Sequence, residues 1–72
     1  MDDDLLTADE VARRLRATPR FVRRLVAERR IEYVKVGRLV RFESRAVADY
    51  IGRHRVAAMT RAELRRYVRE AV

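Results

Sequence analysis

The sequence contains no cysteine and a single histidine among its 72 residues. It therefore has no disulfide framework, no thiol nucleophile and no cysteine-based zinc site. His54 alone cannot build a histidine-rich metal site, so we expect no metal and no cofactor. Ser44 is the only serine, and the sequence shows neither a nucleophile–base pair nor clustered carboxylates. We therefore expect a protein that is not an enzyme.

Long apolar runs are also missing. No apolar stretch approaches the roughly 18 residues that a membrane-spanning helix needs. Asp2, Asp3 and Asp4 have the wrong charge for the start of a secretory signal peptide. With one proline and two glycines, the sequence has no low-complexity linker and no glycine-rich phosphate loop. We expect one small intracellular, cytoplasmic domain, because a chain this short has no room for a second core.

The charge is abundant and unevenly placed. Residues 1–12 hold five acids and no base, whereas residues 13–45 hold twelve Lys and Arg against three Glu. Seventeen of the eighteen bases are Arg, and the net charge is +7. The planar arginine fork pairs with phosphate and guanine edges in a way that lysine cannot match. The composition favours a nucleic-acid partner, although on charge alone a solvated arginine-rich surface remains an alternative.

Capping patterns predict where two N-terminal helices begin. Thr7 and Glu10 form a capping box that opens a helix over about 8–16, with Leu6 and Val11 placed as a hydrophobic staple. Thr18 followed by Pro19 opens a second helix.

The second helix is amphipathic. Its apolar face is formed by Val22, Leu25 and Val26, and Arg20, Arg24 and Ala27 lie opposite, with Arg23 and Phe21 on the flanks. Two helices joined by a short turn, the second presenting bases, are typical of a helix-turn-helix, whose second helix enters the DNA major groove. An ordinary pair of helices with a solvated basic face is the alternative.

Residues 31–42 alternate with a period of two and are rich in β-branched and aromatic residues, which predicts a β-hairpin. A two-residue loop, Gly37-Arg38, would mix apolar and charged residues on each face. A three-residue loop that includes Leu39 places Val36 opposite Val40 and Val34 opposite Phe42, with Lys35 opposite Arg41 on the basic side. We therefore predict the longer loop, with Arg38 at the tip. Placed after a helix-turn-helix, this hairpin is interpreted as a wing.

Two more helices follow. Ser44 is predicted to cap a third helix over about 45–51, with Val47, Tyr50 and Ile51 closing the core and Gly52 as a left-handed end. A second capping box, Thr60 with Glu63, opens a C-terminal helix. Its apolar stripe either folds back on the core or docks a protein partner, and consists of Leu64, Tyr67, Val68 and Ala71. We predict a DNA-binding domain over 1–56 and the C-terminal helix over 57–72.

Residues 5–51 resemble the excisionase family, small winged-helix relatives of the MerR regulators. The matching features are Leu5-Leu6-Thr7, Glu10-Val11-Ala12, Val22 to Val26, Val36-Gly37-Arg38 and the helix from Ala46 to Ile51. The sequence departs from the family pattern at Arg16, where a turn glycine is usual, and at Thr18-Pro19. Either the turn tolerates a non-glycine residue or the first helix ends differently.

The resemblance implies an α+β fold: a small winged helix-turn-helix of the MerR-like or excisionase type, with a β-hairpin wing and an extra C-terminal helix. It implies that the second helix reads the major groove and that the wing lies over the adjacent backbone or minor groove. The residues at these positions are Thr18, Arg20, Phe21, Arg23 and Arg24 in the helix, and Lys35, Arg38 and Arg41 in the wing.

The implied function is that of a recombination directionality factor. Such proteins of phages and other mobile elements bind repeated sites, bend double-stranded DNA and favour excision by a partner integrase, in the nucleoid of a bacterial cell. Integrase or a neighbouring protomer, bound head to tail, would contact Leu64, Tyr67 and Val68. A transcriptional regulator on the same fold is the main alternative, and a basic toxin-neutralising or scaffold protein is a third.

Overall fold

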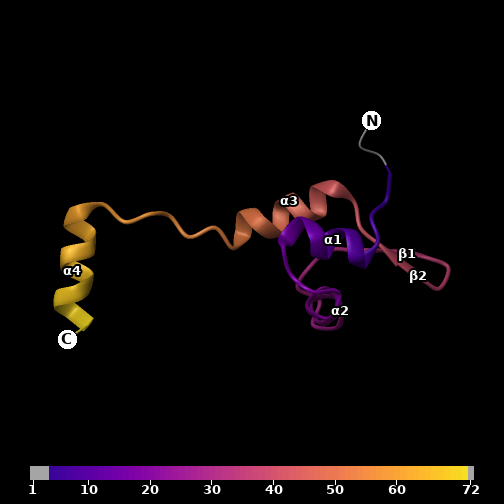
Figure 1. Ribbon diagram of the computed structural model, residues 1–72, viewed down its shortest axis with the longest axis horizontal. Coiled ribbons are helices and arrows are strands. Elements are labelled where there is room, and N and C mark those ends of the chain that lie inside the picture. Colours follow the sequence, from indigo (N-terminus) through magenta and orange to yellow (C-terminus); the bar gives the residue numbers. More distant parts are fainter. Residues whose placement is uncertain (1–3, 72) are drawn as a thin grey trace.

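A computed structural model describes residues 4–71 and shows a small α+β fold (Figure 1). Asp2 and Asp3 lie outside the described residues. The elements in chain order are α1 (Ala8–Leu15), α2 (Pro19–Ala27), β1 (Val34–Val36), β2 (Leu39–Arg41), α3 (Ser44–Arg53) and α4 (Arg61–Ala71). No helix in the described part of the chain is both long and apolar enough to span a membrane.

Local capping explains why the helices begin where they do. At α1, the Thr7 amide donates to the Glu10 carboxylate (2.8 Å) and the Glu10 amide donates to the Thr7 hydroxyl (3.1 Å). At α2, the Phe21 amide donates to the Thr18 hydroxyl (3.1 Å), and Pro19 occupies the first turn. Both predicted starts are confirmed.

Both N-terminal helices end in a left-handed residue that is not glycine. Arg16 has φ 53° and Arg29 has φ 57°. At each end the backbone forms a Schellman motif: the Arg16 amide donates to the Arg13 carbonyl and the Ala17 amide to the Ala12 carbonyl. At the end of α2, the Arg29 amide donates to the Val26 carbonyl and the Arg30 amide donates to the Leu25 carbonyl. The turn therefore tolerates an arginine where a glycine was expected.

The core lies between α1, α2, α3 and the base of the hairpin. Its buried residues have less than a tenth of their surface exposed and are Leu6, Val11, Ala12, Val22, Leu25, Ile31, Phe42 and Val47. Val26, Val40 and Tyr50 pack against this cluster and are partly buried. The predicted apolar face of α2 is confirmed, whereas the contribution of Ile31 was not predicted.

The hairpin has a different register from the predicted one. Val34 pairs with Arg41, Lys35 with Val40 and Val36 with Leu39, so the loop is the two-residue Gly37-Arg38. Gly37 has φ 63°, and a positive φ at the first loop residue is the type II′ pattern that suits two-residue hairpins. The tip projects into solvent, where Val36 and Leu39 are about half exposed. The prediction was wrong because it assumed that an apolar face must be buried along the whole hairpin.

The chain before α1 adds a third partner to the hairpin. Leu6 forms an antiparallel bridge with Phe42: the Leu6 amide donates to the Phe42 carbonyl (2.7 Å), and the Phe42 amide donates to the Leu6 carbonyl (2.9 Å). Because both side chains are buried, this bridge fixes the base of β2 against the start of α1.

Helix α3 differs from the prediction at both ends. Its N-cap is Glu43, without a side-chain capping bond, and Ser44 is the first helical residue. The Ser44 hydroxyl instead accepts a hydrogen bond from Arg14 (3.3 Å). Gly52 lies inside the helix, and α3 continues to Arg53. Ala46 and Val47 are buried, but Ile51 is 42% exposed, so it does not close the core as predicted.

Helix α4 lies apart from the other elements, after an extended segment (Figure 1). The Cα radius of gyration is 16.7 Å, whereas a compact domain of this length has about 11 Å. The predicted capping box is confirmed: the Thr60 amide donates to Glu63 (3.0 Å) and the Glu63 amide donates to the Thr60 hydroxyl (3.1 Å). No residue of α4 is buried. Local capping thus defines this helix without support from the core.

Candidate nucleic-acid interface

Helix α2 presents arginines along one exposed side. Val22 and Leu25 are buried, which turns the opposite side of the helix to solvent. Arg20, Arg23 and Arg24 are all exposed. The structure thus places the predicted basic residues on the outside of a helix whose inner face is fixed by the core.

Four of the predicted site residues meet in one place. Thr18, Arg20, Phe21 and Arg24 line a shallow hollow of about 350 Å³ at the N-terminal half of α2. Phe21 is 37% exposed, so an aromatic surface lies between the guanidinium groups. Two cations beside an aromatic ring suit contact with phosphates, sugars and base edges.

The arginines of α2 are weakly held by the protein itself. Arg24 forms an ion pair with Glu28 at 3.8 Å, with both side chains largely in solvent, and such exposed pairs contribute little to stability. Among residues 4–71, Arg20 and Arg23 have no carboxylate within ion-pair distance. All three guanidinium groups can therefore turn toward an anionic partner at small cost.

The hairpin carries the other predicted contact residues, arranged differently from the prediction. Arg38 lies in the turn, as expected. Lys35 pairs with Val40 and Arg41 pairs with Val34, so the two bases lie on opposite faces of the hairpin instead of facing each other. Arg41 is half-buried, and its guanidinium donates to the Val40 carbonyl at 2.8 Å.

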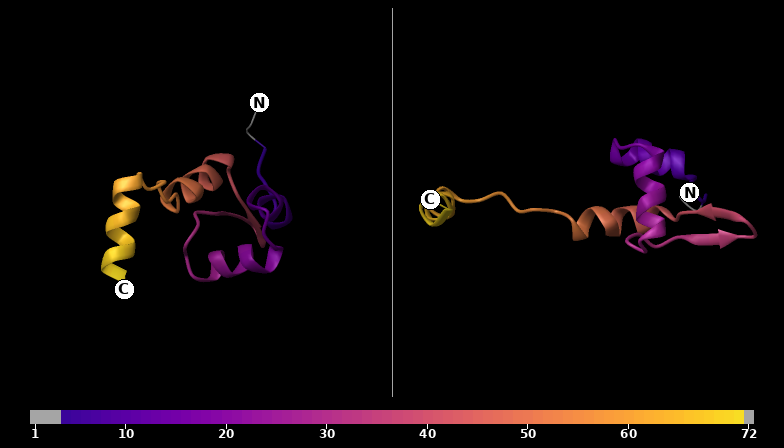
Figure 2. Two further views of the ribbon diagram at one scale, coloured as in Figure 1. Left: turned by 60° about the vertical axis from the view of Figure 1, so that its left-hand side comes forward. Right: turned by 90° about the horizontal axis from the view of Figure 1, so that it is seen from below.

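Helix α2 and the hairpin lie next to each other, as two views show (Figure 2). An apolar hollow of about 360 Å³ lies between α1, α2 and β2. Its lining consists of Ala8, Arg23, Val26, Ala27, Val40 and Phe42. The predicted helix residue Arg23 therefore shares a surface with the strand that leads from the hairpin tip.

The loop after α2 carries basic residues that were not predicted as site residues. Arg29, Arg30 and Arg53 line a third hollow, together with Ile31, Glu32 and Tyr33. Arg53 lies far from the other two in sequence, and tertiary contact brings them together. The adjacent residues Arg29 and Arg30 after α2 were visible in the sequence. The periodicity of the helices did not indicate that Arg53 of α3 would lie beside them.

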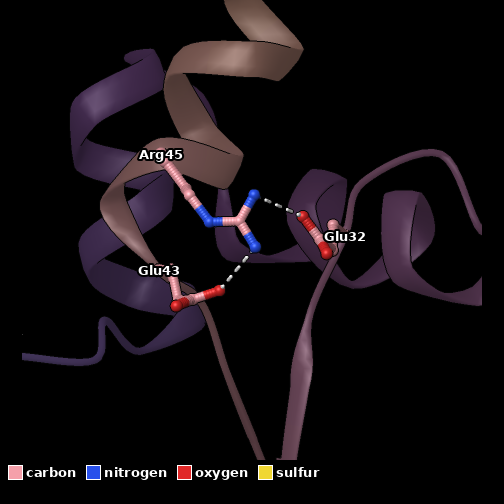
Figure 3. A network of polar contacts seen from close by, with 3 residues as sticks. All are labelled: Glu32, Glu43 and Arg45. Atoms are coloured by element: carbon pink, nitrogen blue, oxygen red, sulfur yellow. Dashed lines mark hydrogen bonds and ion pairs between the residues drawn. The ribbon is translucent and has the colours of Figure 1, made fainter.

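An ion-pair network fixes the start of the hairpin against α3 (Figure 3). Arg45 lies between Glu32 and Glu43, with nitrogen–oxygen distances of 3.6 and 3.2 Å. This network joins the segment before β1 to the first turn of α3. It leaves Arg45 neutralised, so we do not include Arg45 in the interface.

The residues predicted to dock a partner are exposed on α4. Leu64, Tyr67 and Val68 are each more than half exposed. No contact with a partner tests their role, which remains a prediction.

Comparison with known proteins identifies the family. No curated protein and no solved structure matches the chain significantly. The family model of the helix-turn-helix domain matches residues 5–55, which include α1, α2, the hairpin and α3 and end before α4. This match, which covers most of the chain, supports sequence-specific binding of double-stranded DNA by the arginine-bearing fold described above. The chain therefore belongs to the helix-turn-helix domain family.

Proposed function

We propose that this protein is an excisionase, a recombination directionality factor of the winged, MerR-like type that bends DNA and promotes excision by a partner integrase. The observation that carries the proposal is the placement of α2 and the hairpin side by side, with exposed arginines on the helix and Arg38 at the hairpin turn. A helix for the major groove beside a basic hairpin is a suitable arrangement for contacting two neighbouring grooves.

Helix α2 is the proposed reader of base sequence. Arg20, Arg23 and Arg24 are exposed and long enough to reach base edges, and arginine forms bidentate bonds to guanine O6 and N7. Thr18 and Phe21 flank this set at the N-terminal end of the helix. We expect one of these arginines to read a guanine and the others to hold phosphates.

The hairpin is the proposed wing. Arg38 at its tip is placed to enter a minor groove, where a narrow A·T-rich segment concentrates negative potential. Lys35 and Arg41 lie on opposite faces of the hairpin, and we expect them to contact the phosphate strands on the two sides of that groove. Simultaneous contact by helix and wing favours bent DNA, as an architectural role requires.

Helix α4 is the proposed contact to other proteins. Its exposed stripe, which includes Leu64, Tyr67 and Val68, would meet the integrase or a protomer on an adjacent repeat. An amphipathic helix laid into a groove of a partner is a common mode of recognition. The domain division at residue 56 corresponds to this separation of roles.

The test of the reading helix begins with selection of binding sites from a randomised DNA library. Each of Arg20, Arg23 and Arg24 is replaced by Ala in turn. We expect one of these variants to lose about 1–3 kcal/mol of DNA-binding free energy and to relax the preference at one base pair. The triple Ala variant should lose specific binding. A matched control replaces Arg65, Arg66 and Arg69 on α4, which removes the same charge. Wild-type affinity of the α2 triple variant would mean that α2 is not the reader.

Footprinting separates recombination from transcriptional regulation. Protection of short direct repeats beside an attachment site, together with stimulated excision by an integrase encoded nearby, supports the excisionase. A protected palindrome over a promoter, without effect on excision, supports a dimeric regulator instead. Failure of the wild-type protein to bind any duplex at moderate salt would contradict both roles.

A further inference from the structure

A basic cluster lies at the C-terminal end of α2, away from the hairpin tip. Arg29, Arg30 and Arg53 line a hollow of about 520 Å³ with Ile31, Glu32 and Tyr33. We call these three arginines the Arg29 cluster. In Figure 2 the loop after α2 passes close to the C-terminal end of α3, and the Arg53 guanidinium donates to the Arg30 carbonyl at 3.2 Å. The cluster is therefore built from two elements that the fold holds together.

Contacts within the protein orient the Arg53 side chain. In addition to its bond with the Arg30 carbonyl, its guanidinium lies over the Tyr50 ring, 5.8 Å from the ring centroid. Tyr50 is itself stacked on His54, with ring centroids 4.2 Å apart. A guanidinium with a defined position loses less conformational freedom when it binds an anion.

Of the two carboxylates near the cluster, Glu28 pairs with Arg30, a member of the cluster, and Glu32 pairs with Arg45 outside it. Glu28 lies 3.8 Å from Arg24 and 3.6 Å from Arg30, and Glu32 is engaged by Arg45 at 3.6 Å (Figure 3). Within residues 4–71, Arg29 and Arg53 have no carboxylate within ion-pair distance. The cluster therefore has positive charge that the surrounding protein does not neutralise.

Arg29 also occupies a backbone position that favours glycine. Its φ is 57°, and a left-handed conformation costs a residue with a Cβ atom free energy that glycine avoids. The Arg29 side chain is exposed and has no hydrogen bond or ion pair within the described residues. The fold thus gives no structural reason for an arginine at this position.

We propose that the Arg29 cluster binds the phosphodiester backbone of DNA beside the C-terminal end of α2. The proposal rests on the proposed placement of α2 in the major groove. A nine-residue helix is about 14 Å long, close to the roughly 12 Å width of that groove. Both ends of α2 then come near phosphate strands, and the Arg29 cluster lies at the C-terminal end. Arginines paired with phosphate oxygens in this way position the protein without reading sequence.

Replacing Arg29 by Gly gives the sharpest test, because it affects stability and binding in opposite directions. The substitution removes one cation and relieves the backbone, so the urea midpoint should rise. Affinity for a mixed-sequence duplex of about two helical turns should fall roughly three- to tenfold, and the salt slope should decrease by about one. Arg65→Ala on α4 removes the same charge away from the core and serves as the matched control. A purely structural residue would not show this combination.

Phosphate neutralisation then locates the contact. Single methylphosphonates are placed along a duplex recovered by site selection. At the phosphates nearest the C-terminal end of α2, these substitutions should weaken DNA binding by the wild-type protein but not by Arg29→Gly or Arg53→Ala. The proposal would be overturned if the methylphosphonates weakened binding by the wild type and the variants equally. It would also be overturned if Arg29→Gly bound DNA with the affinity and salt slope of the wild type. If alanine at Arg20, Arg23 or Arg24 still relaxes specificity in that case, the proposed function of α2 stands and only the cluster is excluded. A wild-type protein that binds neither duplex would overturn both.

Discussion

Arg16 ends α1 in a conformation that glycine adopts without strain. Its φ of 53° and ψ of 42° lie in the left-handed region, where a Cβ atom approaches the following carbonyl oxygen. The Schellman hydrogen bonds of this turn are complete, so the chain accepts the strained residue and keeps the angle between α1 and α2. A residue without left-handed strain at position 16 would therefore increase the free energy of unfolding.

Replacing Arg16 by Gly is expected to stabilise the protein by about 0.5–1 kcal/mol, because the relief of left-handed strain exceeds the added freedom of the unfolded chain. Urea unfolding followed by circular dichroism measures the change. Arg13→Gly is the control: this position lies inside α1 and is exposed, so the same substitution should destabilise by about 1 kcal/mol. An Arg16→Gly variant no more stable than wild type would show that the turn relaxes around arginine.

At the scale of elements, the two capping boxes define where helices begin through local hydrogen bonds alone. Thr7 with Glu10 and Thr60 with Glu63 set the starts of α1 and α4, although α1 packs on a core and α4 does not. In both boxes the amide of the capping threonine, which donates to the glutamate, lowers the pKa of that carboxyl below its usual value of 4.5. The charged carboxylate is therefore the form that supports each helix start.

Acid should therefore weaken α4 first, because this helix has no packing to replace the cap. A carboxyl whose pKa is lower in the helix than in the coil stabilises the helix fully above its usual value of 4.5. That contribution is lost as the pH falls through the lowered pKa. Cα chemical shifts of residues 61–71 should thus report loss of helix in acid. Glu63→Gln keeps an acceptor oxygen but does not titrate, so this transition should disappear. Constant helicity through the protonation of Glu63 would contradict the argument.

The hairpin shows where sequence reasoning failed. The alternation of apolar and polar residues correctly predicted two strands and a turn at Gly37. The predicted register, however, assumed that apolar residues pair on a face that the core covers. Only the base of the hairpin, at Phe42 and Val40, is packed on the core, whereas Val36 and Leu39 extend into solvent. The loop length was therefore decided by turn geometry at Gly37, and apolar matching did not control it. For the same reason, the meeting of Arg53 with Arg30 was not predictable without the packing of α3.

Replacing Arg38 by Ala should weaken DNA binding while the fold stays intact, because the side chain lies in a solvent-exposed turn. We expect a salt slope lower by about one and altered preference at base pairs flanking those read by α2. Binding titrations on the selected duplex and its flank variants measure both effects. Leu39→Ala, which changes the neighbouring exposed residue without removing charge, is the control. Wild-type affinity and flank preference for Arg38→Ala would leave the hairpin a structural role.

At the scale of the whole molecule, the chain consists of a helix-turn-helix core and an outlying helix. Every residue from Ile51 to Ala71 is exposed, and an isolated helix of eleven residues is marginal in water. The match to the helix-turn-helix family ends before α4, and we expect the core to bind DNA without this helix. What α4 adds is an exposed apolar stripe on a helix that a covering partner would stabilise.

Removal of residues 58–72 should spare binding to a single DNA site but weaken cooperative binding to adjacent repeats or excision with the partner. Binding isotherms on one-site and two-site duplexes measure the difference. Leu64→Ser with Tyr67→Ser in the full chain is the matched variant, since it removes the stripe and keeps the charge. Strong amide protection of residues 64–71 in the free monomer, with loss of folding on truncation, would instead make α4 part of the core.

The bridge between Leu6 and Phe42 has a consequence for how quickly the molecule assembles. The chain between these two residues contains α1, α2, β1 and β2. The bridge therefore forms only after a long loop has closed, at an entropic cost that local helices do not have. We expect α1 and α2 to collapse together first and this bridge to close afterwards. Leu6→Ala should then accelerate unfolding and leave the folding rate nearly unchanged, as stopped-flow kinetics would show. We therefore expect the Leu6–Phe42 bridge to slow the unfolding of a helix-turn-helix that has already formed.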